Sequence, residues 1–183
     1  FSRYATQAIS DLVEFIEKFA KVILVSVPDE SNAFTVFETL NDRGMQLSSI
    51  DLLKNYLYGI SGQKIKFIQH NWMNMMSIIE SAESTLKPID FIRHCWIARN
   101  GVVREKELYQ NIKRKTTKQS DATELSTQLS DDAEKYIAII DYNNDFWNYF
   151  DDEAREHIQA INILQIKQIR PLLLAILQKF EPK

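Results

Sequence analysis

The chain has little cysteine, glycine, proline or histidine, and each shortage excludes a class of protein. Its single cysteine, Cys95, cannot form an internal disulfide, which excludes a disulfide-stapled fold and predicts a reducing, cytoplasmic setting. Four glycines and four prolines are too few for the many tight turns of an all-β fold. The three histidines, at positions 70, 94 and 157, form no metal-ligand pattern, so no metal site is expected.

Long apolar runs are also missing, and none approaches the length that crosses a bilayer, so no membrane partner is expected. The length of 183 residues, 45% of them hydrophobic, suits one domain, or one domain with a small neighbour. A net charge of −3 does not indicate a nucleic-acid-binding domain, which is usually basic. The chain opens on Phe1 rather than on a methionine, so we expect it to be part of a longer protein.

Apolar residues recur at helical spacing along most of the chain and predict a mainly all-α fold. A short β-branched run at 22–27 predicts one buried strand, whose partners would lie outside this sequence. Polar residues 118–124 predict a loop, and the aromatic-rich residues 142–150 predict an irregular segment. The predicted helices span residues 4–21, 29–43, 48–59, 63–84, 88–99, 104–117, 125–141 and 152–167, with a last helix that begins at Pro171.

A polar turn joins the predicted helices 29–43 and 48–59, and it is the most informative stretch of the sequence. The backbone N–H groups of such a turn, followed by a helix N-terminus, can bind an anion. Arg43 can hold a phosphate through two parallel hydrogen bonds, and Lys54 can add a point charge. From spacing alone, structural roles explain most of the turn, since Asn41 can cap a helix end and Gly44 can permit the turn.

Residues 37–54 resemble the block Phe-x-x-x-Asn-x-x-Gly-x-x-Leu-Ser…Asp-Leu-Leu-Lys of the GmrSD-type modification-dependent restriction proteins. The resemblance is close over 34–57 and looser over three later segments, 89–96, 103–109 and 170–174. It implies a ParB/sulfiredoxin-like, nuclease-type amino-terminal domain followed by a helical domain. On that basis residues 1–60 would be the carboxy-terminal part of the α/β nuclease-like domain, contributing the remnant strand, and 63–183 a helical bundle.

The family resemblance further implies an NTP-dependent DNA restriction protein that acts in anti-phage defence. The family's Asp-Gly-Gln-Gln-Arg motif is missing here, and so is its His-Asn-His-type nuclease domain. We therefore expect no catalytic residue and no cofactor in this chain itself, with NTP and a divalent metal serving the parent protein. The expected partners are DNA, the missing amino- and carboxy-terminal domains, and further copies of the chain. The residues that would shape part of the nucleotide pocket are Asn41, Arg43, Gly44 and Lys54.

The predicted helix 104–117 supports a second interpretation, a non-enzymatic helical module that binds DNA or a protein. Basic side chains on and just after this helix can meet phosphates without reading base sequence, although a solvated helix explains them as well. They are Arg104, Lys106, Lys113, Arg114, Lys115 and Lys118.

A nucleophilic pair of His94 and Cys95 is excluded because neighbouring side chains on a helix point about 100° apart. Cys95 is instead expected to be buried as a small hydrophobic residue, and His94 to lie as a polar residue on the flank of its helix.

Overall fold

The computed structural model describes residues 2–19, 21, 49–82 and 86–180. Within these ranges the secondary structure is helical and contains no strand, which confirms the mainly all-α prediction. The predicted strand at 22–27 and the predicted helix at 29–43 lie outside the described residues. The first helix, α1 (Ser2–Phe19), has the predicted amphipathic spacing, but its large apolar side chains from Ile9 to Phe19 are 49–68% exposed.

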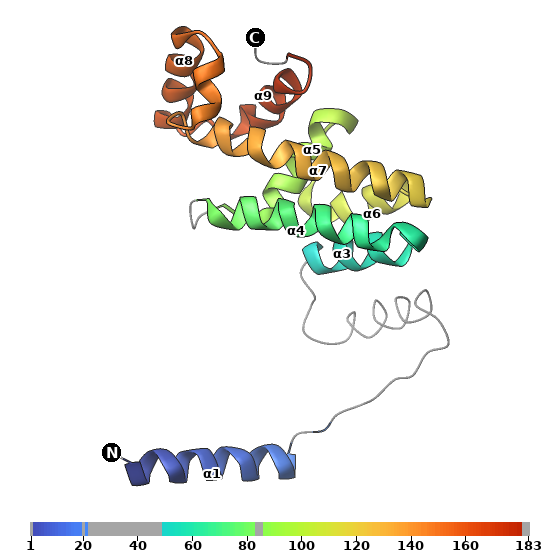
Figure 1. Cartoon of the computed structure of the whole chain (residues 1–183), viewed down its shortest axis with the longest axis vertical. Helices are drawn as coiled ribbons and strands as arrows, with labels where there is room; N and C mark the ends of the chain where they lie inside the picture. The colour runs from blue at the N-terminus through green and yellow to red at the C-terminus, as the bar shows by residue number, and fades with distance from the viewer. Residues whose placement is uncertain (1, 20, 22–48, 83–85, 181–183) are drawn as a thin grey trace.

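The remaining helices follow one another through short connections (Figure 1). They are α3 (Ser49–Gly59), η1 (Gly62–Lys64), α4 (Ile65–Ser81), α5 (Pro88–Asn100), α6 (Glu105–Lys115), α7 (Gln119–Ile140), η2 (Asp145–Tyr149), α8 (Asp152–Ile163), η3 (Lys167–Ile169) and α9 (Arg170–Leu177).

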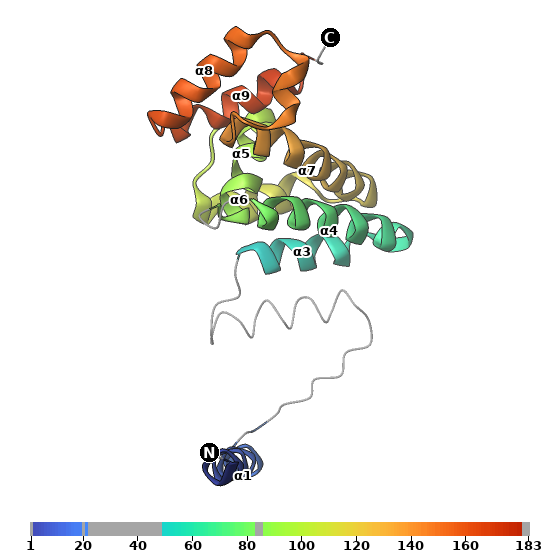
Figure 2. The same ribbon diagram turned by 60° about the vertical axis from the view of Figure 1, so that its left-hand side comes forward.

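Helix α7 organises the bundle and lies alongside α4 in both views (Figures 1 and 2). Apolar residues of α4 are buried in one stripe at Ile68, Trp72, Met75 and Ile79, and this stripe faces one on α7. The α7 stripe repeats every three or four residues, which keeps its side chains on one face of the helix. Its buried members include Leu125, Leu129, Ala133 and Tyr136.

Helices from distant parts of the sequence complete the bundle. Helix α9 packs against α5 and α7, and α8 also contacts α7. At the other end of the bundle, α3 packs against α4, α5 and α6 (Figure 2). The connection between α8 and α9 therefore lies near the carboxy end of α7, and the two ends of the bundle have different neighbours.

The loop predicted for residues 118–124 is wrong, because the first turn of α7 begins at Gln119. The carboxylate of Asp121 accepts backbone N–H groups from Thr117 at 2.9 Å and from Lys118 at 3.0 Å. These bonds supply partners for donors at the helix start, and they lower the pKa of Asp121. The polar composition that predicted a loop thus belongs to a capped, solvated first turn.

Candidate functional site

Of the four predicted nucleotide-binding residues, Asn41, Arg43 and Gly44 lie outside the described part of the chain. Lys54 is described and sits on α3, with its side chain 35% exposed. Its Nζ lies 3.1 Å from Oδ1 of Asp51, one turn earlier on the same helix. The role of these four residues toward a phosphate stays a prediction.

Helix α3 is anchored firmly to the helical bundle. Leu53 and Leu57 are buried in its core. The hydroxyl of Tyr56 donates to the backbone carbonyl of Thr116 at 2.6 Å, and its ring meets Tyr109 edge-on at 6.1 Å between centroids. The position of α3, and with it of Lys54, is therefore fixed by the end of α6.

The six predicted DNA-binding cations do not form one uniform surface. Lys113 is half-buried, and its ammonium lies 5.6 Å and 5.7 Å from the ring centroids of Tyr56 and Tyr109. This cation–π arrangement stabilises the α3–α6 contact. Lys115 donates to Asn100 Oδ1 at 3.0 Å, while Arg104, Lys106, Arg114, Lys115 and Lys118 are all exposed.

The two adjacent residues of α5 differ in their surroundings. Cys95 is buried as predicted, and burial raises its thiol pKa well above the usual value, so the thiol is not activated. His94 is also buried, and its predicted place on a polar flank is wrong. Its Nδ1 lies 2.7 Å from the hydroxyl of Tyr136 on α7. Burial, aided by Arg93, lowers the pKa of His94 to about 4, so the ring is neutral near pH 7.

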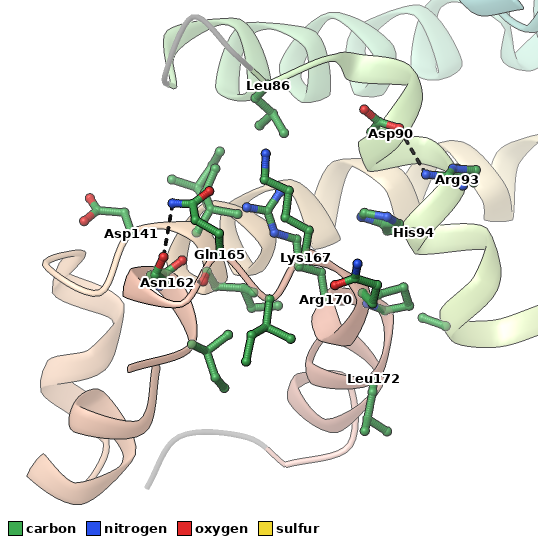
Figure 3. Close-up of a pocket in the computed structure, with 18 of the residues that line it drawn as sticks. Leu86, Asp90, Arg93, His94, Asp141, Asn162, Gln165, Lys167, Arg170 and Leu172 are labelled. Carbon is green, nitrogen blue, oxygen red and sulfur yellow. Dashed lines mark hydrogen bonds and ion pairs between the residues drawn. The ribbon is translucent and has the colours of Figure 1, made fainter. Parts of the chain in front are cut away.

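A cavity of about 1150 Å³ opens between α5, the end of α7 and the connection from α8 to α9 (Figure 3). Its lining includes four cationic side chains and two carboxylates. The cations come from three separate places in the sequence: Lys87 and Arg93 at α5, Lys167 on η3, and Arg170 on α9. The carboxylates are Asp90, paired with Arg93 at 3.2 Å, and Asp141.

Sequence reasoning missed this cavity because its walls are brought together only by folding. No local spacing links His94 to Arg170, since each lies on a different helix and the pairing of α5 with α9 depends on the whole bundle. The available signal was weak: residues 89–96 and 170–174 both carry the looser family resemblance, and both contribute to the lining of this cavity.

Among the described residues, no group of three or more His, Cys, Asp or Glu side chains is placed to hold a metal ion. Among the helices of the same ranges, none combines the length and the apolar character that a bilayer span requires.

Comparison with known families supplies an identification for the first part of the chain. Residues 2–58 match the family described as GmrSD restriction endonuclease, N-terminal domain. Searches of curated proteins and of solved structures returned no match. The matched range contains the whole block at 37–54 that carried the resemblance, and it ends inside α3. The match over residues 2–58 thus confirms the resemblance to the GmrSD-type restriction endonucleases that the sequence predicted.

Proposed function

We propose that this chain is part of a GmrSD-like, NTP-dependent DNA restriction protein that defends its host against phage. In this role it supplies part of a nucleotide pocket and a helical scaffold, and it is inactive alone. The observation that carries the proposal is the family match over residues 2–58, whose last helix is built into the bundle core through Leu53 and Leu57.

The physical basis of the pocket is the short distance in sequence between the Asn41–Gly44 turn and α3. Because α3 is held by α4, α5 and α6, its amino end is a fixed point for the turn that precedes it. A helix amino end carries partial positive charge and free N–H groups, which favour a phosphate. Lys54 adds a cation one turn into the same helix. Residues of the parent protein beyond this chain would complete the binding site for the NTP and its divalent metal.

The first prediction tests Asn41 in the intact protein that contains this chain. Asn41→Ala should lower the rate of NTP hydrolysis by about 10-fold or more, since a hydrogen bond to a charged group contributes about 1.5–3 kcal/mol. Phosphate release measures the rate. Asn148→Ala is the matched control, because Asn148 is exposed on η2 and lies outside the family match.

Two results would contradict the nucleotide assignment. One is an unchanged hydrolysis rate in an Asn41→Ala protein that unfolds at the same temperature as the wild type. The other is NTP hydrolysis by the 183-residue chain alone, which would place a complete site within it.

Contact with DNA through α6 is a second proposed role. Its support is the exposure of five of the six predicted cations, which leaves them available to phosphates. Lys113 is better explained by its contacts with Tyr56 and Tyr109.

A further inference from the structure

We propose that the cavity between α5, α7, α8 and α9 binds a small phosphorylated ligand of nucleotide size. This site is separate from the Asn41–Gly44 turn, so the inference goes beyond the proposed function and does not depend on it. Four observations support it: the charge of the cavity, the polar residues that Tyr136 holds at its wall, the part-exposed guanidinium of Arg93 and the shape of the α8–α9 connection.

The cavity is positive although the chain as a whole carries a net charge of −3. Four cations face two carboxylates, and one of these, Asp90, is already paired with Arg93. Within the described ranges, neither Lys87 nor Lys167 forms an ion pair. In Figure 3 the side chains of Lys167 and Arg170 reach into the space below Leu86. Such a concentration of positive charge in a concave site favours a multiply charged anion.

Tyr136 holds two polar residues at one wall of the cavity. The guanidinium carbon of Arg170 lies 6.0 Å from the ring centroid of Tyr136, a cation–π arrangement. Nδ1 of His94 lies 2.7 Å from the Tyr136 hydroxyl and is hydrogen-bonded to it. Arg170 and His94 both line the cavity, so a cation and a polar ring are held in place there by the same residue.

Arg93 supplies the third observation. Its Nη2 is bonded to Asp90, and its side chain is 29% exposed and lines the cavity. A guanidinium has five N–H donors, so the contact with Asp90 leaves donors for a second anion. Guanidinium groups bind phosphate through parallel hydrogen bonds.

The connection from α8 to α9 supplies the fourth observation. Gln165 has a φ of 55°, a left-handed conformation that glycine adopts without cost and other residues rarely adopt. This turn ends α8 and brings Gln165, Ile166 and Lys167 to the cavity wall. A glutamine here accepts backbone strain and places an amide in the lining, which is typical of positions kept for binding.

The remaining lining indicates what accompanies the phosphate. Isoleucine side chains, including Ile97, Ile140 and Ile166, give apolar walls, and Gln168 adds a further amide. A volume of about 1150 Å³ exceeds what a bare phosphate fills and accommodates a drug-sized molecule. Apolar walls with amide groups suit a flat body with polar edges, as a nucleobase has.

The test uses the 183-residue chain and two probes, inorganic pyrophosphate and GTP, titrated by calorimetry at low salt. Lys167→Glu should weaken the binding of both by about 10-fold or more, because it replaces an attractive charge at the cavity with a repulsive one. Lys66→Glu is the matched control, since Lys66 is exposed on α4 and does not line the cavity. Equal binding by Lys167→Glu and wild type, or no binding by wild type, would overturn the proposal.

Nitrogen-15 spectra of the imidazoles locate the ligand without a substitution. GTP should shift the ring signals of His94 and leave those of His70 and His157, which are exposed elsewhere on the bundle. A short oligonucleotide without terminal phosphates is the second probe. If it shifted the His94 signals and GTP did not, the cavity would bind a DNA strand, and the proposal of a small ligand would be overturned. Asn41→Ala should leave this binding unchanged, which separates the cavity from the nucleotide pocket proposed above.

Discussion

At the residue scale, Asp132 is a buried carboxylate that joins three helices of the bundle or their ends. This α7 carboxylate is 1% exposed and is paired with the guanidinium of Arg99, while Gln178 donates to it at 3.0 Å. Asp132→Ala should lower the free energy of unfolding by about 3 kcal/mol, the low end for a broken buried pair, because Arg99 is 24% exposed and can be partly hydrated. Urea unfolding followed by tryptophan fluorescence measures the change.

The neighbouring Asp131 provides the control for this substitution. It lies on the same helix but is exposed, so Asp131→Ala should change the free energy of unfolding by no more than about 0.5 kcal/mol. If the two variants unfolded alike, Asp132 would be contributing nothing beyond an ordinary surface carboxylate.

Single residues were predictable from the sequence where their role follows from their own chemistry. Burial of Cys95 is an example, because a lone thiol on an apolar helix face packs as a small hydrophobic residue. His94 was mispredicted because its burial depends on Tyr136, which is 42 positions away in sequence. Without that hydroxyl, a buried imidazole would lack a partner, and a polar flank was the reasonable expectation.

At the scale of elements, the exposed cations of α6 allow its proposed contact with DNA to be tested. Lys106 is exposed, whereas Lys113 packs against Tyr56. Lys106→Ala can therefore remove a phosphate contact without lowering the stability of the bundle. If Lys106 meets a phosphate, the substitution should weaken binding to duplex DNA of any sequence and reduce the salt dependence of log K by about 0.9. Fluorescence anisotropy at several salt concentrations gives both quantities. Lys64→Ala on η1 is the control. If the Lys106→Ala variant had the same salt slope as the wild type, Lys106 would not contact DNA.

Helix positions followed from hydrophobic spacing, whereas several helix ends did not. The helix at α4 was predicted because its apolar residues recur at helical spacing, and burial of one face enforces that period. The start of α7 was missed because Asp121 caps it. Its carboxylate accepts the backbone N–H of Lys118, a capping role for which glutamate or glutamine is the usual residue. The end of α8 was missed because Gln165 adopts the left-handed conformation usually given to glycine.

At the scale of the whole molecule, the last helix of the family-matched segment belongs to the core of the helical bundle. The predicted division into residues 1–60 and 63–183 remains a prediction, but α3 contributes Leu53, Tyr56 and Leu57 to the same core as α4 and α5. The all-α class was evident from composition and spacing. The pairing of α5 with α9 was not, because contacts between distant helices leave no local pattern in the sequence.

Because α3 shares the core of the bundle, a substitution that removes buried side-chain atoms from α3 should destabilise the whole bundle. Leu57 is fully buried, and Leu57→Ala should lower the free energy of unfolding by about 2–5 kcal/mol through lost burial and the cavity it leaves. The three tryptophans are buried reporters on α4, α5 and η2, so their fluorescence follows the bundle and not the segment that carries the substitution. Leu12→Ala on α1 is the control, since Leu12 is 58% exposed and its loss should leave the transition in place. A tryptophan transition unmoved by Leu57→Ala would mean that α3 folds with the amino-terminal domain alone, and Lys54 would then lose the fixed position that its proposed role requires.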